Sequence, residues 1–130
     1  MRLIPTVLLC VALAVPAVAK PALRDVKEID DTLMQIAIAD EIRKSCSDIS
    51  ARMLRALGQV NALESKAKTL GYSDQEIDDY VTSKAEKKRM RAKAEAWLAS
   101  QGVNAKDKKA LCAFGHAQID KKTYIGSLLH

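Results

Sequence analysis

The chain has 130 residues, of which 21 are basic and 16 acidic, and 48% are apolar. That apolar share argues against disorder, and the scarcity of proline and glycine argues against a β-sandwich or barrel, which needs many turns. The abundance of alanine, leucine, lysine and glutamate favours an all-α fold.

The N-terminus predicts a cleavable export signal over residues 1–19. Arg2 precedes an apolar run over Leu3–Val15, and an Ala-Val-Ala sequence ending at Ala19 provides the small residues that signal peptidase requires. This signal is typical of bacterial export. We therefore expect a periplasmic protein whose single helical domain occupies residues 20–130.

Two other interpretations of the N-terminus are less favoured. An uncleaved anchor would need more apolar residues, since this run is too short to cross ~30 Å of hydrocarbon as a helix. A lipoprotein would carry its lipid on Cys10, but Leu9 stands where the lipoprotein peptidase requires a small residue.

Two cysteines remain after removal of the signal, Cys46 and Cys112, an even pair in an oxidising compartment. We expect them to form one structural disulfide. No C-x-x-C motif supports a redox site and no C-x-x-C-H motif supports haem attachment. A zinc site would combine both cysteines with His116, but a fourth ligand is not evident, so we expect no metal and no cofactor.

The first predicted helix spans Asp25–Lys44 and is apolar on nearly all sides over Leu33–Ala39, which is typical of a central helix. A second helix follows, with Ser47 or Asp48 as its N-cap and Gly71 just after its end. Its apolar face is formed by residues spaced three and four apart: Ile49, Met53, Leu57, Val60, Leu63, Ala67 and Leu70.

A capping box predicts the start of the third helix. Ser73 is the N-cap, Glu76 stands three residues later, and Tyr72 can pack on Ile77 as a hydrophobic staple. The pattern allows one helix as far as Gln101. Its apolar face changes direction along the way, so either the helix bends or its two halves pack on different neighbours.

Asn104 is the predicted N-cap of a fourth helix, and a short apolar element over Tyr124–Leu129 can dock on the body. The expected architecture is a compact bundle of about four helices plus a short C-terminal helical element. Trp97, the only tryptophan, favours a core position over the alternative of an anchor in a partner's groove.

A cationic face is the most distinctive polar feature of the third predicted helix. Four residues fall within an arc of about 100°, whereas Arg89 and Lys93 point elsewhere. The four are Lys84, Lys87, Lys88 and Arg91. They form either a docking face for an acidic protein or an anionic membrane surface, or a solvated face that keeps the protein soluble, with the solvated face slightly favoured.

The sequence does not favour nucleic acid as a partner, because no aromatic residues alternate with the cations and the compartment is unsuitable. It also lacks G-x-S-x-G, a phosphate-binding glycine loop and H-E-x-x-H. The two histidines are His116 and the terminal His130. We therefore expect a protein that is not an enzyme and has no small-molecule substrate.

Residues 71–91, together with Ile42–Arg55 and its Cys46, resemble an uncharacterised family of small exported bacterial proteins, a domain of unknown function. The resemblance implies an association with gene clusters for the respiratory NADH:quinone oxidoreductase. We therefore expect an accessory or assembly protein on the periplasmic side of an inner-membrane complex. The alternative is a free periplasmic holdase that exposes apolar surface under stress.

Overall fold

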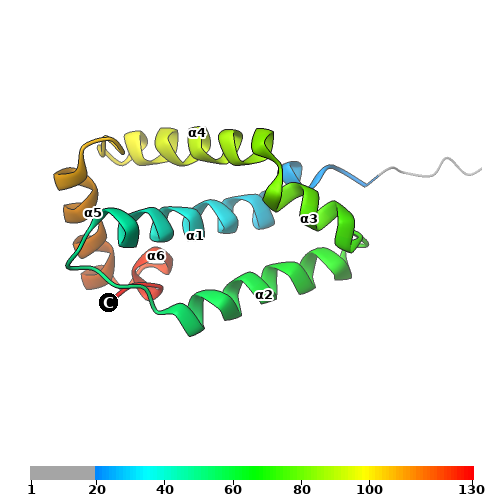
Figure 1. The fold of residues 1–130 in the computed structure, drawn as a ribbon, viewed down its shortest axis with the longest axis horizontal. Helices are drawn as coiled ribbons and strands as arrows, with labels where there is room; N and C mark the ends of the chain where they lie inside the picture. Colours follow the sequence, from blue (N-terminus) through cyan, green and yellow to red (C-terminus); the bar gives the residue numbers. More distant parts are fainter. Residues whose placement is uncertain (1–19) are drawn as a thin grey trace, which may run out of the picture.

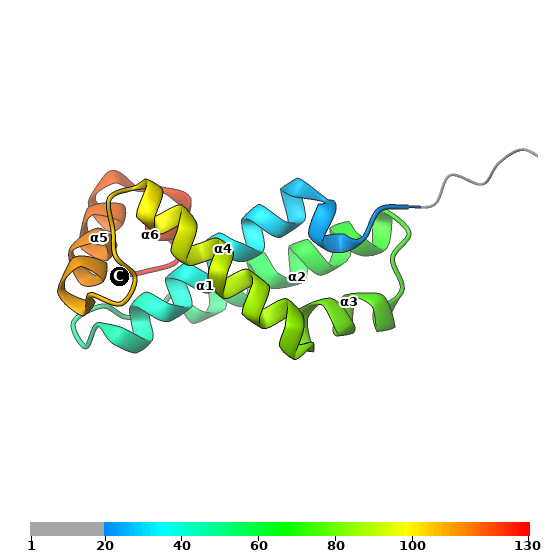
Figure 2. The ribbon, with the colours of Figure 1, turned by 90° about the horizontal axis from the view of Figure 1, so that it is seen from above.

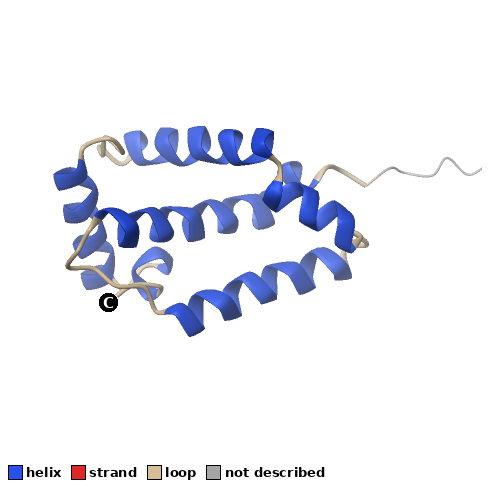
Figure 3. Cartoon of the chain, in the orientation of Figure 1, coloured by secondary structure: helices blue, strands red, loops and turns tan. Residues whose placement is uncertain are grey.

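The computed structural model describes residues 20–130, and the predicted export signal lies outside these described residues. The described chain is all α-helical, as predicted, and has no strand (Figure 3). Its elements in chain order are η1 (Leu23–Asp25, a 3-10 turn), α1 (Lys27–Ser45), α2 (Met53–Thr69), α3 (Asp74–Thr82), α4 (Lys84–Ser100), α5 (Lys108–Lys121) and α6 (Tyr124–Ser127).

Helix α1 lies at the centre, with α4 on one side and α2 on the other, while α5 and α6 close one end (Figure 1). Seen from above, α4 crosses over α1 (Figure 2). The prediction of a central helix is confirmed, since α1 contributes five buried apolar side chains. They are Ile29, Met34, Ile38, Ala39 and Ile42.

The predicted N-cap at Ser47 or Asp48 is wrong, because α2 begins only at Met53. The intervening segment pairs with the C-terminal tail instead. Ser50 and His130 exchange two backbone hydrogen bonds, and the Arg52 N–H donates to the Leu128 carbonyl. These long-range bonds satisfy the backbone groups that a longer helix would have used.

The third predicted helix is two helices, α3 and α4, which separate at Ser83. Ser83 has extended backbone angles, and its hydroxyl accepts a hydrogen bond from the Glu86 N–H at 3.0 Å. The two helices pack on different neighbours, because Tyr80 of α3 belongs to a small apolar cluster with Leu23 whereas Met90 of α4 lies in the main core. The change of direction in the apolar face is therefore explained by a break.

The fourth predicted helix starts later than expected. Asn104 accepts a hydrogen bond from the Lys106 N–H within the loop, and Asp107 caps α5 through the Ala110 N–H. The short tail docks as predicted, since Ile125 of α6 is fully buried. Gly126 makes this docking possible, because a Cβ at that position would meet the Gln118 carbonyl oxygen at 1.9 Å.

The predicted disulfide is present and joins Cys46, after α1, to Cys112 in α5. Cys46 is almost completely buried in the main core. Trp97 packs edge-to-face on Phe114, with ring centroids 6.0 Å apart, which agrees with the predicted core position.

The cap at Ser73 is confirmed, since its hydroxyl accepts from the Glu76 N–H at 3.1 Å. Replacing Ser73 with alanine should lower the free energy of unfolding by about 1 kcal/mol, because the N–H loses its partner. Urea unfolding measures this loss. Ser65→Ala, an exposed serine inside α2, is the control and should lower stability less or not at all. Equal losses in both variants would contradict the capping role.

Candidate interaction surface

The four residues of the predicted cationic face, Lys84, Lys87, Lys88 and Arg91, are all exposed on α4. None of them forms an ion pair with a carboxylate of residues 20–130. The Ser83 cap fixes where α4 begins and therefore which way these side chains project. The helix thus presents four positive charges without an internal neutralising partner.

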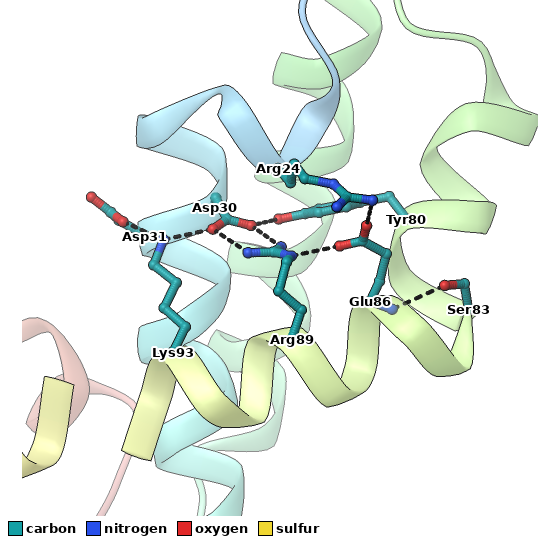
Figure 4. Close-up of polar contacts among 8 residues, drawn as sticks. All are labelled: Arg24, Asp30, Asp31, Tyr80, Ser83, Glu86, Arg89 and Lys93. Carbon is teal, nitrogen blue, oxygen red and sulfur yellow. Dashed lines mark hydrogen bonds and ion pairs between the residues drawn. The ribbon is translucent and has the colours of Figure 1, made fainter. Parts of the chain in front are cut away.

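The remaining cations of the same run, Arg89 and Lys93, turn towards α1 and bind the buried carboxylate of Asp30 (Figure 4). Arg89 donates from Nη2 to Oδ1 at 2.6 Å and from Nη1 to Oδ2 at 3.1 Å. Lys93 donates to Asp30 Oδ2 at 2.5 Å and to Asp31 Oδ1 at 2.6 Å. These bonds fasten α4 to α1 and orient the cationic face outwards.

Two further contacts extend this charged cluster. Tyr80 of α3 donates its hydroxyl proton to Asp30, and Glu86 accepts from Arg89 Nε at 2.8 Å (Figure 4). Glu86 also pairs with Arg24 of η1. The cluster therefore ties η1, α1, α3 and α4 together at one point.

The pKa values of the cluster follow from these bonds. Burial alone would raise the pKa of Asp30, but hydrogen bonds from Arg89, Lys93 and Tyr80 outweigh it and lower that pKa to about 2. Burial and the Asp30 charge raise the pKa of the Tyr80 hydroxyl. The bond to Asp30 likewise raises the pKa of Arg89. Asp30 is therefore ionised at neutral pH and holds Arg89 and Lys93 in their charged forms.

Sequence reasoning missed Asp30 as a site residue. It follows Ile29 at the start of α1, where an acidic side chain is explained by its favourable interaction with the helix N-terminus. Its partners lie 59 and 63 residues away, so local spacing cannot reveal them.

A groove of about 920 Å³ lies between α1 and α4 and is partly open to solvent. Its walls extend along α1 from Leu33 to Ser45 and along α4 from Glu86 to Leu98, and the loop before α5 closes one end. The apolar and aromatic residues that line it are Leu33, Ala37, Ile38, Tyr80, Val81, Met90, Ala94, Leu98, Ala105 and Leu111, of which Ile38, Leu98 and Leu111 are almost completely buried. The groove therefore combines an apolar floor with walls made of helices.

The rim of this groove carries excess positive charge. Lys87 and Arg91 stand on the α4 wall, and Lys106 and Lys108 stand at the α5 end. The groove also includes two carboxylates without an ion pair among residues 20–130, Glu41 and Glu95. Asp40 is neutralised by Arg43 and Lys44, at 2.7 Å each. Of the four residues of the cationic face, the structure thus brings Lys87 and Arg91 to the groove.

A second unusual surface lies on α2. Only Ala67 of this helix is fully buried, and much of the predicted apolar face is open to solvent. Leu54 is 88% exposed, and three other apolar side chains of the same helix are also exposed. They are Met53, Leu57 and Val60. The periodicity that predicts the helix therefore does not predict burial of that face.

The cysteine pair and His116 form no metal site. Cys46 and Cys112 are joined to each other, and the His116 Nε2 instead contacts Asp48 Oδ2 at 2.7 Å. That contact lowers the pKa of Asp48. Within the part of the chain that is described, no cluster of three or more potential ligands gathers at one point.

These features define a small disulfide-linked helical protein with a cationic face beside an apolar groove. The chain belongs to the family of unknown function DUF5333, whose family model matches residues 21–130. No curated protein and no solved structure matches the chain. None of the helices within residues 20–130 combines the length and apolar character needed to cross a bilayer.

Proposed function

We propose that this chain is a non-enzymatic exported protein that docks on an acidic partner at the periplasmic side of an inner-membrane complex. The observation that supports the proposal is the set of exposed, internally unpaired cations on α4: Lys84, Lys87, Lys88 and Arg91. The family resemblance suggests the respiratory NADH:quinone oxidoreductase as that complex, because the resemblance implies an association with the gene clusters that encode this enzyme.

The contrast within α4 is the physical argument for docking. Arg89 and Lys93 are neutralised by Asp30, whereas the cations on the outer face are left without a carboxylate partner. Clustered like charges on a rigid helix create a positive potential that attracts an acidic surface and speeds encounter. A face with mixed signs would serve solubility equally well, so the bias in sign favours recognition.

Export to the periplasm is the second part of the proposal. Its support is the disulfide between Cys46 and Cys112, since such bonds persist in oxidising compartments. The predicted signal sequence supports the same location.

Reversing two charges, Lys87→Glu with Arg91→Glu, should weaken capture of the partner without unfolding the domain, because both side chains are exposed and unpaired. The measurement is affinity purification of the tagged protein from detergent-solubilised membranes at low and high salt. Capture by the unaltered protein should fall with salt, since charges more than about 8 Å apart are largely screened at physiological ionic strength.

The matched control is Lys121→Glu with Lys122→Glu, which changes the net charge equally at the end of α5 and should leave capture intact. Circular dichroism checks the fold of both variants. Equal capture by the two variants would contradict docking through α4. If the protein binds vesicles of anionic lipid without any partner protein, and the charge reversal abolishes that binding, the cationic face binds a membrane surface.

A holdase is the alternative, and the exposed apolar side chains of α2 favour it. In that case the protein alone should suppress light scattering by an aggregating unfolded client. Leu54→Ser with Leu57→Ser should abolish the suppression, whereas the charge reversal on α4 should not affect it.

A further inference from the structure

We propose that the groove between α1 and α4 holds an amphipathic helix of an acidic partner protein, with the apolar stripe of that helix on the groove floor. This inference rests on the proposed function and specifies which structural element of the partner is recognised.

The dimensions fit a short helix. The α1 wall runs from Leu33 to Ser45, which at 1.5 Å per residue is about 18 Å, or roughly three helical turns. Ala37 on α1 and Ala94 on α4 both line the groove, and neither is fully buried. Their short side chains leave room on the floor for the larger apolar side chains of a partner.

The partial exposure of the groove to solvent favours one kind of occupant. An acyl chain is apolar on all sides, so a groove that is partly open to solvent would leave part of it in water. An amphipathic helix has one apolar stripe and one polar face, which matches the groove.

The floor also disfavours an extended peptide. The groove is lined by side chains of helices, whose backbone groups are bonded within those helices. An extended peptide lying on this floor would therefore have few partners for its own backbone groups. A helix satisfies those groups internally, so it can meet an apolar floor at lower cost.

The charges define the polar edges of the occupant. Lys87 and Arg91 on the α4 wall, with Lys106 at the α5 end, present cations to one side of a bound helix. Carboxylates next to these cations would find partners, whereas Glu41 on α1 and Glu95, one turn beyond Arg91 on α4, would repel carboxylates placed next to them. The matching ligand is thus a helix with acidic residues along one edge of its apolar stripe, and not a uniformly acidic one.

The test uses the purified protein and a labelled helical peptide of 15 residues that carries a leucine stripe flanked by glutamates on one edge. A scrambled peptide of the same composition keeps the charge and loses the stripe. Fluorescence anisotropy should show binding of the striped peptide, with the scrambled peptide at least about tenfold weaker, a difference of ~1.4 kcal/mol.

Filling the groove gives the matching protein variants. Ala94→Phe should weaken binding of the striped peptide at least about tenfold, because the new ring occupies the floor. Ala96→Phe, on the exposed surface of the same helix and outside the groove, should leave binding unchanged. Circular dichroism verifies the fold, and Ala37→Leu on the opposite wall replaces Ala94→Phe if that variant loses helix.

The outcomes separate this inference from the proposed function. If the striped and scrambled peptides bind alike and Ala94→Phe has no effect, the groove is not the binding site of the helix, although the cationic face can still dock a partner. Failure of the striped peptide to bind also overturns the inference, whereas the proposed function fails only if charge reversal leaves capture from membranes unchanged. If the protein binds phosphatidylglycerol vesicles and Ala94→Phe abolishes that binding, the occupant of the groove is lipid. If the protein dimerises and Ala94→Phe abolishes the dimer, the occupant is a second copy of the chain. Either result would overturn the proposed occupant.

Discussion

Replacing Asp30 with alanine should lower the free energy of unfolding by about 3 kcal/mol, a larger effect than for any other single carboxylate considered above. Asp30 is 1% exposed and neutralises both Arg89 and Lys93. Its removal leaves the Tyr80 hydroxyl without its partner and takes the buried carboxylate from Arg89 and Lys93, which keep only Glu86 and Asp31. The expected loss lies at the low end for a broken buried pair, because the side chains of Arg89 and Lys93 keep 27% and 31% exposure and can turn to water.

Asp31 provides the matched control. It is the next residue and binds Lys93 as well, but its side chain is 37% exposed. Asp31→Ala should cost less than about 1 kcal/mol, as for other exposed ion pairs. Urea unfolding of the two variants decides the matter, and similar losses would mean that the cluster is only a surface feature.

The same carboxylate gives stability a defined dependence on pH. The pKa of Asp30 is about 2 in the folded protein, below the ordinary value of 3.8. A lowered pKa contributes stability above the unfolded value that is lost as pH falls through the folded value. The wild-type protein should therefore lose ~2 kcal/mol more than Asp30→Asn between about pH 5 and pH 2. Parallel curves for the two proteins would contradict this assignment.

The local signals in the sequence predicted most helix boundaries, and the misses have physical causes. Ser73 and Ser83 are each followed three residues later by glutamate, and both hydroxyls accept the expected N–H. The sequence predicts a helix start only at Ser73, because Gly71 interrupts the helix pattern just before it, whereas no glycine or proline stands near Ser83. In this chain the serine with a glutamate three residues later marks a helix break at Ser83, where the serine hydroxyl caps α4.

Long-range contacts explain the other differences. The segment before α2 is extended because its backbone pairs with His130 and Leu128, at the far end of the chain. The sequence does not predict the groove either. Lys87 and Lys106 line the same groove only because α4 crosses over α1 (Figure 2) and the loop after α4 leads back to the groove. Periodicity identifies which side chains share a helix face, but it does not identify what covers that face.

Removing the disulfide is the second change with a large expected effect. The bond links Cys46 and Cys112 across 66 residues of sequence. Closing a loop of that size restricts the unfolded chain and stabilises the fold by about 4 kcal/mol in the chain-entropy model. Cys46→Ala with Cys112→Ala should therefore lower the melting temperature by roughly 15–25 °C for a domain of about 110 residues.

Urea unfolding distinguishes this entropic effect from a packing defect. The unfolded double variant is no longer cross-linked and exposes more surface, so the dependence of its unfolding free energy on urea should become steeper. Reductant should shift the midpoint of the native protein towards that of the double variant and leave the double variant unchanged. A native protein whose midpoint does not respond to reductant would contradict the role of the bond.

The bond joins the end of α1 to α5, whose first turn carries Lys108 at the groove. Its loss should therefore loosen that end of the groove before it affects Asp30, which is fastened to α4 independently.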